Sequence, residues 1–332
     1  QNIVKNIRNE GKTKGEGMLG NFNIRTDLAL EAKEGCDAQK ISVRGVTVQE
    51  EKDEKREIYT TTVKISTENG AKAMGKPVGT YITIEAPNLS IPDEGYHREI
   101  SKEVARHLKR LIGKEKKSIF VVGLGNRDIT PDALGPEVVG NLHITRHVVR
   151  EYGQLFLKEK ESREISSLVP GVMAQTGMET LEIIRGVAQE ACPDVMIVID
   201  ALAARSTKRL NRTIQITDAG IHPGSGVGNH RSGINRQSLG IPVIAIGVPT
   251  VVDAATIVND TMLNLVDAMD ESENLKKLGG TLKTLNREEK YQIIRELLTP
   301  NLNTMFVTPK DIDETIKRIS FTISEGINIA FA

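Results

Sequence analysis

The sequence lacks tryptophan, contains only two cysteines and has few aromatic residues, which make up 3% of the chain. Cys36 and Cys192 are too few for a disulfide framework, and free thiols are typical of a reducing cytoplasm. The scarcity of aromatic rings argues against a surface on which nucleic-acid bases stack. The charge is balanced, with 44 basic and 44 acidic residues, and this argues against direct nucleic-acid binding.

Long hydrophobic runs are also missing. A membrane-spanning helix needs a run of about 18 apolar residues or more, and the sequence contains none, so we predict no membrane partner. The first residues are polar and include no apolar signal core, so we expect a cytoplasmic location. The chain of 332 residues is nevertheless long enough to bury a substantial core.

The sequence does contain strand patterns that alternate with helix patterns. Continuous apolar runs at 119–122, 195–199 and 243–248 are typical of strands buried on both faces, as in a parallel sheet. The predicted helices cover residues 93–112, 132–151, 176–191, 252–269, 288–298 and 311–330. We therefore predict an α/β fold with a doubly wound, mostly parallel sheet flanked by helices. His107, on the first of these helices, is expected at its surface or at the boundary of the core.

The first hundred residues have a different pattern. Residues 41–48, 58–65 and 81–84 alternate between apolar and polar side chains, which predicts strands. The charged segment 50–57 between the first two is predicted to be an exposed hairpin tip. These strands predict a β-rich hairpin layer appended to the main sheet.

The predicted domain organisation is simple. Residues 1–21 have no hydrophobic periodicity, and residues 1–27 are expected to form a mobile arm. Residues 28–332 are expected to form a single α/β domain, in which 28–92 is the β-rich subdomain and 93–332 the core of sheet and helices.

Two acidic residues follow two of the buried strands. Asp132 lies a few residues after the turn 123–126 that follows the run 119–122, and Asp200 comes directly after the run 195–199. Ligands of open α/β sheets bind at the carboxyl ends of the strands, so we expect both carboxylates at one edge. Two such acids can bind a metal ion, share a proton or activate water. The alternative is that each acid only caps the helix behind it.

Other residues are expected near this edge. The turn after residue 122 contains Gly123, Gly125 and Asn126, whose backbone amides are candidates for holding an oxyanion. His222 lies in a glycine-rich loop and is the candidate third member of the site. The turn is not a dinucleotide-binding motif, because the third glycine of that motif would fall on Asp128.

The chain contains several long motifs: IRTDLALEA at 24–32, VVGLGN at 121–126, TPDALGP at 130–136, IDALAAR at 199–205 and GIHPGSGVGN at 220–229. Together they resemble the germination proteases of spore-forming bacteria, over a region from about residue 22 to the C-terminus. The resemblance implies an α/β core similar to that of hydrogenase-maturation endopeptidases. It also implies an endopeptidase that degrades small acid-soluble, DNA-binding spore proteins in the spore core during germination.

The resemblance places the two essential acids of the family at Asp132 and Asp200. The first hypothesis is an aspartic-type endopeptidase without a cofactor, in which the two acids share a proton and activate water. The second is a metal-dependent endopeptidase, in which Asp132, Asp200 and His222 bind a divalent ion. The third is a non-catalytic protein that binds spore proteins.

The resemblance further implies an inactive zymogen and a homotetramer. The family cleaves after an acid and before an apolar residue, and the N-terminal motif contains such bonds. We therefore predict that the arm is a propeptide removed by self-cleavage near Asp27–Leu28, with Glu31–Ala32 as the next candidate bond. The alternative is that residues 22–32 are simply an edge strand.

Overall fold

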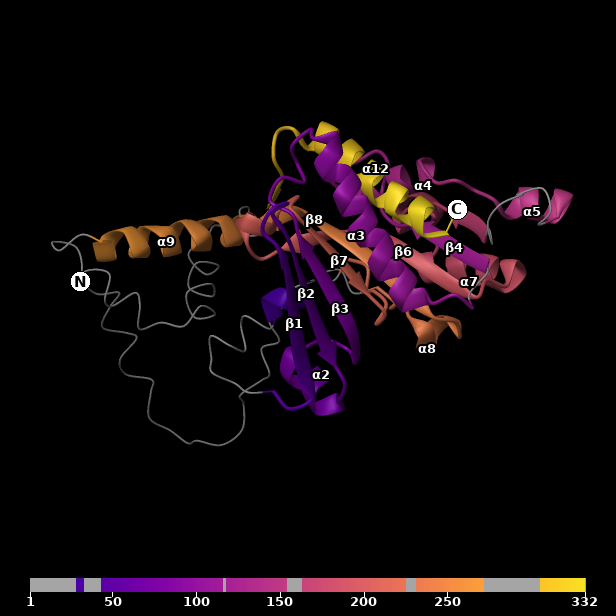
Figure 1. Ribbon diagram of the computed structural model, residues 1–332, viewed down its shortest axis with the longest axis horizontal. Helices are drawn as coiled ribbons and strands as arrows, with labels where there is room; N and C mark the ends of the chain where they lie inside the picture. Colours follow the sequence, from indigo (N-terminus) through magenta and orange to yellow (C-terminus); the bar gives the residue numbers. More distant parts are fainter. Residues whose placement is uncertain are drawn as a thin grey trace.

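The computed structural model describes residues 28–32, 43–115, 118–153, 163–224, 231–271 and 305–331. Within these ranges, the strands join in one nine-stranded sheet flanked by helices (Figure 1). The strands are β1 (Val46–Asp53), β2 (Ile58–Ile65), β3 (Gly79–Glu85), β4 (Ser118–Gly123), β5 (Glu164–Leu168), β6 (Val195–Ala204), β7 (Thr213–Thr217), β8 (Val243–Asp253) and β9 (Phe306–Val307). The helices are α2 (Glu68–Met74), α3 (Glu94–Ile112), α4 (Leu134–Gly140), α5 (Arg146–Tyr152), α6 (Met173–Thr176), α7 (Thr180–Ala191), α8 (Arg236–Leu239), α9 (Ala254–Glu271) and α12 (Ile312–Phe331), with short 3₁₀ helices η2 (Thr130–Asp132) and η4 (Thr207–Arg209). Among these described helices, none combines the length and hydropathy that a membrane crossing requires.

The sheet has a parallel part and an antiparallel part. Strands β5, β4, β6 and β8 are parallel neighbours. Strands β7, β3, β2 and β1 continue the sheet as antiparallel neighbours, and β9 pairs antiparallel with β8. The α/β fold class is confirmed, although the strand directions are more mixed than the expected mostly parallel sheet.

The N-terminal hairpin is part of the main sheet and does not form a separate layer. Tyr81 of β3 pairs with Thr217 of β7, and Glu85 pairs with Thr213. An unpaired strand edge leaves backbone hydrogen-bonding groups unsatisfied, and β3 satisfies those of β7. The strand β1 runs through half of the charged segment, so only residues 54–57 form the turn of the hairpin.

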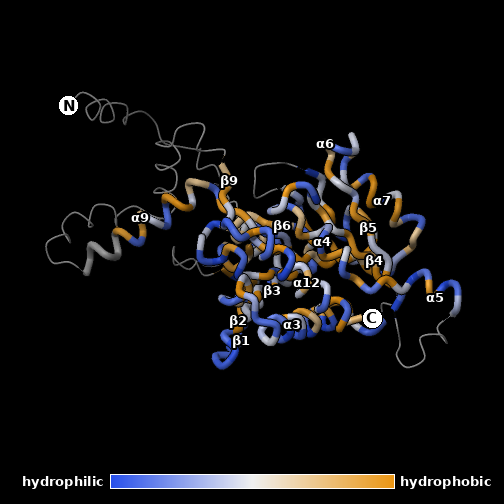
Figure 2. Tube along the Cα trace, turned by 90° about the horizontal axis from the view of Figure 1, so that it is seen from above, coloured by the Kyte–Doolittle hydropathy of each residue, from blue (hydrophilic) through white to orange (hydrophobic). Residues whose placement is uncertain are grey.

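Two hydrophobic cores lie on opposite faces of the parallel strands, because successive side chains of a strand point in opposite directions. Val121 and Ile197 belong to the core that contains residues of α3, α4 and α12. Phe120 and Val198 belong to the core that contains residues of α7. Figure 2 shows α3 and α7 on opposite sides of these strands.

One predicted helix is interrupted. Instead of a helix over residues 132–151, α4 ends at Gly140 and α5 begins at Arg146. Between them the N–H of Thr145 donates to the carbonyl oxygen of Ile165 at 3.1 Å, which holds the chain against β5. The predicted helix at 288–298 lies outside the described residues.

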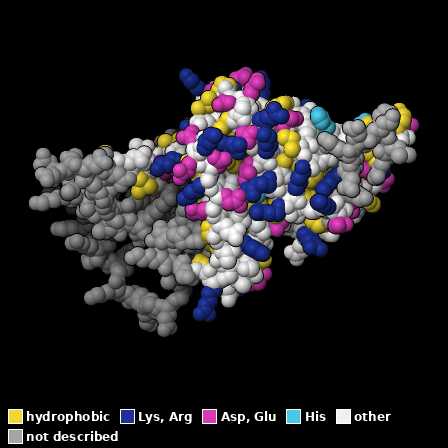
Figure 3. Space-filling model, viewed as in Figure 1, with side chains coloured by type: hydrophobic (Ala, Val, Ile, Leu, Met, Phe, Trp, Pro, Cys, Tyr) yellow, Lys and Arg dark blue, Asp and Glu magenta, His cyan; other side chains and the backbone are white. Residues whose placement is uncertain are grey.

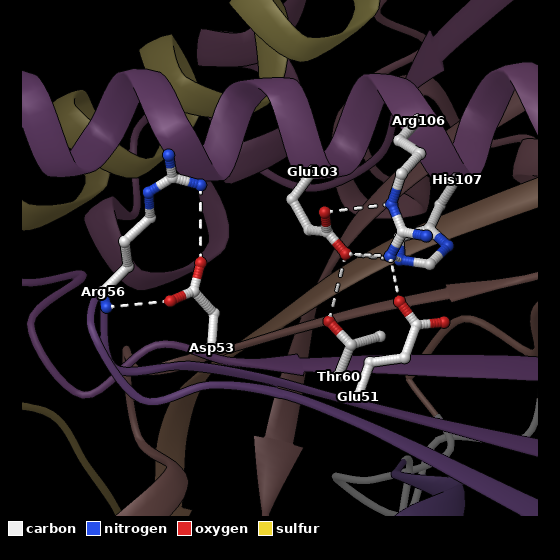
Figure 4. Close-up of polar contacts among 7 residues, drawn as sticks. All are labelled: Glu51, Asp53, Arg56, Thr60, Glu103, Arg106 and His107. Carbon is white, nitrogen blue, oxygen red and sulfur yellow. Dashed lines mark hydrogen bonds and ion pairs between the residues drawn. The ribbon is translucent and has the colours of Figure 1, made fainter.

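Charged side chains join α3 to the hairpin (Figure 4). Arg106 binds Glu51 of β1 at 2.7 Å, and the hydroxyl of Thr60 on β2 donates to Glu103 at 3.2 Å. His107 is fully buried, in contrast to the surface or boundary position expected for it, and its Nε2 lies 2.9 Å from Glu103. Figure 3 shows acidic and basic side chains intermingled on this face of the molecule.

The short segment 28–32 is buried, and residues 29–32 form one helical turn. The N–H of Ala29 donates to Oε1 of Gln215 at 2.7 Å. The carboxylate of Glu31 forms an ion pair with Arg209 at 3.4 Å. An edge strand, the alternative for residues 22–32, is therefore wrong for the part of this segment that the structure describes.

Candidate active site

The carboxyl ends of the parallel strands surround a cavity of about 420 Å³. Asp132 and Asp200 both line it, as the sequence predicts. His222 and Gly125 also line the cavity, whereas Gly123 and Asn126 are not among its lining residues. The cavity therefore brings together the two acids and the histidine, while two residues of the expected oxyanion turn do not line it.

Asp132 is placed by a tight turn after β4. Gly125 has a φ of +112°, and a Cβ at this position would collide with the main-chain oxygen of Asp132. The N–H of Asn126 donates to Oδ2 of Asp132 at 2.8 Å. This amide already binds the aspartate, so its contribution is to position the carboxyl group.

Asp200 lies within β6 rather than at the end of a strand, because β6 continues to Ala204. Its position at the rim comes from the shorter neighbour: Gly123, the last residue of β4, pairs with Ile199. Asp200 is thus the first residue of β6 beyond the end of β4. Its side chain is only 6% exposed, and the N–H of Ala201 donates to Oδ1 at 3.0 Å.

The two strand ends are tied together. The N–H of Leu124 donates to the carbonyl oxygen of Ile199 at 2.8 Å. Gly135, at the start of α4, packs so closely that a Cβ there would lie 2.7 Å from the same carbonyl oxygen. The close packing of this glycine lets the turn that carries Asp132 approach the strand that carries Asp200.

The cavity shifts the pKa of Asp132. Burial raises the pKa of its carboxyl group, while the N–H of Asn126 and the positive charge of Arg231 lower it and offset part of the effect. Arg231 itself lines the cavity. A carboxyl group with a raised pKa holds a proton more readily near neutral pH, which suits acid–base catalysis.

The cavity also contains residues that the sequence patterns did not single out. Ile129 and Phe306 line it with side chains that are 53% and 40% exposed, and Thr250 contributes a buried side chain. Phe306 comes from β9, more than 170 residues from Ile129 in the sequence, so no local pattern predicts that the two share a wall. Arg231 differs from these residues, because its position at the end of the glycine-rich loop indicates from the sequence that it lies near the cavity.

The three expected metal ligands do not form a metal site in the described part of the chain. Among those residues, no three or more His, Cys, Asp and Glu side chains are grouped closely enough to hold an ion. His222 is exposed, and its Nε2 would lie 2.7 Å from a Cβ placed on Gly233, so its ring packs against that glycine. The donor set therefore does not fit a divalent ion in this arrangement. His230 lies outside the described residues.

The fold and the site define a class of protein. It is an α/β protein with two carboxyl groups in one cavity at the edge of its sheet, an arrangement typical of acid–base hydrolases. The family model described as germination protease matches residues 24–269 and 265–332. The germination protease of Caldanaerobacter subterraneus subsp. tengcongensis is 50% identical over 311 residues, which cover 93% of this chain and 94% of that protein. The chain belongs to the germination protease family, as its motifs predict.

Other relatives are similar over comparable lengths. The germination protease of Clostridium perfringens strain ATCC 13124 is 46% identical, with 93% of this chain and 95% of that protein covered. That of Priestia megaterium is 39% identical, with 94% of each chain covered. Among solved structures, a hydrogenase maturation protease from Thermococcus kodakarensis matches with a TM-score of 0.27 and 17% identity, covering 43% of this chain and 80% of that one.

Proposed function

We propose that the chain is an endopeptidase of aspartic type in which Asp132 and Asp200 together activate a water molecule. The observation that carries the proposal is that Asp132, in η2 after β4, and Asp200, within the neighbouring strand β6, line one cavity. The site needs no cofactor for this chemistry.

The mechanism requires one proton on the pair. The ionised carboxylate removes a proton from water, and the water oxygen attacks the carbonyl carbon of the scissile peptide bond. The protonated carboxyl group then gives its proton to the leaving amide nitrogen. Because the two acids share one site, their pKa values belong to the pair, and the burial that raises the pKa of Asp132 helps to keep that proton bound.

The substrates we propose are the small acid-soluble spore proteins, cut in the spore core during germination. The walls of the cavity support a peptide with an acidic and an apolar side chain next to each other. Arg231 supplies a positive charge for the acidic side chain, and Ile129 and Phe306 supply exposed apolar surface. The homotetramer of the family is proposed for this chain as well, and light scattering after gel filtration tests it.

The test of the acid pair is the substitution of each acid by its amide. Asp132→Asn and Asp200→Asn should each lower turnover of an acid-soluble spore protein by about a thousandfold or more, because each removes an acid–base partner. Asp313→Asn, on an exposed position of α12, is the matched control and should keep full activity. Near wild-type turnover by either folded variant contradicts the proposal.

The same assay separates the alternatives. Full activity after dialysis against a chelator supports the aspartic type, and loss of activity restored by a divalent ion supports the metal-dependent one. Binding of the spore protein without any cleavage by the processed wild-type chain supports the non-catalytic alternative.

We also propose that the chain is a zymogen that cuts itself near Asp27–Leu28, and that the uncut arm blocks the cavity or keeps it inactive. Asp27 lies outside the described residues, and Leu28 is buried. Mild acid should speed the cut, because protonation reduces the repulsion between the acids of the arm and those of the cavity. Mass spectrometry of the new N-terminus after incubation from mildly acidic to neutral pH tests this. Equal processing at neutral pH, or a cut far from residues 27–32, contradicts it.

A further inference from the structure

Thr250 occupies an irregular position in β8. Leu202 of β6 pairs with Pro249, and the next residue, Ala203, pairs with Val251, so Thr250 is an extra residue without a partner on β6. Such a β-bulge bends the strand and redirects the side chain of the extra residue. The side chain of Thr250 is 1% exposed and lines the same cavity as the two acids.

The bulge lets Thr250 join three segments that are far apart in the sequence. Its hydroxyl donates to the carbonyl oxygen of Pro131 at 2.7 Å. Its own carbonyl oxygen accepts a hydrogen bond from the hydroxyl of Thr308, just after β9, at 2.8 Å. The 3₁₀ helix η2, the strand β8 and the segment that follows β9 are thus connected through a single residue.

The bond to Pro131 acts on the peptide that leads into Asp132. The N–H of Asp132 donates to the carbonyl oxygen of Ile129 at 2.8 Å, and its Oδ2 accepts from Asn126. Both of these contacts come from the same turn as Asp132 itself. The hydroxyl of Thr250 instead ties that turn to β8, the strand that pairs with β6 and therefore with the backbone of Asp200.

We propose that Thr250 is a positioning residue, which holds the Pro131–Asp132 peptide in place and so fixes Asp132 relative to Asp200. The inference rests on the proposed acid pair. Without the hydroxyl, the Pro131 carbonyl loses the partner that holds it against β8. A displacement of about 1 Å at a reacting group can lower a rate about a hundredfold.

The test compares Thr250→Val with Thr250→Ser. Valine keeps the branched shape and removes the hydroxyl, whereas serine keeps the hydroxyl. Thr250→Val should lower kcat about 10- to 100-fold and leave KM within about twofold, because the cavity keeps its shape while the acids lose their alignment. Thr250→Ser should stay within about threefold of wild-type kcat.

Thr83→Val is the matched control. Thr83 is fully buried in β3, and in the described part of the chain its hydroxyl has no hydrogen-bond partner. This variant should leave both kcat and KM unchanged. Wild-type kcat in Thr250→Val, a change confined to KM, an equal loss in Thr83→Val, or no recovery with serine overturns the inference.

A second readout does not depend on turnover. Carboxyl-carbon NMR titration of the folded protein should give a different pKa for Asp132 in Thr250→Val than in the wild type, and the same pKa in Thr83→Val. An unchanged pKa together with unchanged kcat overturns the inference while the amide variants of the two acids still decide the proposed function. If Thr250→Val does not fold, Thr250→Cys takes its place, because a thiol is only a weak hydrogen-bond donor. Its kcat should be measurable but lower than that of Thr250→Ser and of the wild type. A wild-type kcat in Thr250→Cys equally overturns the inference.

Discussion

Two cavities of nearly equal size differ in how their charged side chains are paired. The candidate active-site cavity measures about 420 Å³, and the groove between the β1–β2 hairpin and α3 measures about 430 Å³. In the groove, acids and bases are paired: Arg106 binds Glu51 at 2.7 Å, and Lys102 binds Glu99 at 2.6 Å. In the cavity, Asp132 and Asp200 are accompanied by Arg231.

The pKa values follow this difference. Burial raises the pKa of Glu103 in the groove, but hydrogen bonds from His107 and Arg106 outweigh it and lower the pKa to about 2. In the cavity, burial prevails and the pKa of Asp132 is raised. A carboxylate that is paired with neighbouring cations holds segments of the chain together. A carboxyl group that is buried with fewer cationic partners has a raised pKa and is better suited to proton transfer.

The largest effect on stability is expected from Glu103→Gln. This substitution removes the carboxylate that binds Arg106 and the buried His107, and it should lower the free energy of unfolding by about 2 kcal/mol at pH 7, with turnover unchanged. Because the folded pKa of Glu103 is lowered, its stabilisation is present above its ordinary value of 4.5 and is lost as the pH falls towards about 2. The difference between variant and wild type should therefore shrink over that range.

Urea denaturation at pH 7 and at pH 3 measures this difference. Glu54→Gln, in the exposed turn of the same hairpin, is the control and should leave the midpoint unchanged. An unchanged midpoint for Glu103→Gln at pH 7 would show that the paired groove does not hold the hairpin to α3.

A smaller effect is expected from Arg231→Gln in the cavity. It should lower kcat/KM about tenfold for peptides with an acid beside the cut, and less for peptides in which that acid is replaced by its amide. Since Arg231 lowers the pKa of Asp132, its loss should also raise that pKa, and a limb of the pH–rate profile that follows this group should move to higher pH. Arg236→Gln, exposed on α8, is the control, and equal losses for both kinds of peptide contradict the assigned role.

The smallest effect is expected from Asp132→Asn on stability. A raised folded pKa means that the carboxyl group stabilises the fold below its ordinary pKa of 3.8 and that this contribution is lost as the pH rises through the folded pKa. The inactive asparagine variant should thus melt at or up to about 2 °C above the wild type at pH 7. This gain should vanish below pH 3.8, as differential scanning calorimetry can show. A marked loss of stability at pH 7 would place Asp132 with the structural acids of the groove.

The sequence predicts the positions of the two acids in one cavity better than it predicts the residues around them. The runs that became β4 and β6 were recognisable because strands buried on both faces need continuous apolar side chains. Asp132 and Asp200 followed from where those runs end. The bulge at Thr250 could not be predicted, because the apolar run stops at Val248 while β8 continues to Asp253 by pairing with the extension of β6.

Burial of charged residues was equally hard to predict. His107 lies on the buried face of α3, where its Nε2 is 2.9 Å from Glu103, one helical turn earlier, and Glu103 also binds Arg106. The helix pattern shows that positions 103 and 107 are neighbours. It does not show that the hairpin covers them, because that depends on strand pairing far away in the sequence.

The buried segment 28–32 sets a limit on how quickly the N-terminus of the chain can be shortened. A protease acts on an extended and accessible bond, and the bond between Glu31 and Ala32 lies in a helical turn whose side chains are buried. Glu31 also accepts a hydrogen bond from the N–H of Arg205 at 3.2 Å, so this turn must detach from the end of β6 before the bond can be cut. A local opening that costs about 3 kcal/mol leaves fewer than about one molecule in a hundred open at any moment. We therefore expect proteolytic cleavage beyond Leu28 to be slower by about a hundredfold or more than cleavage of an accessible bond, so that the buried segment limits further shortening of the chain.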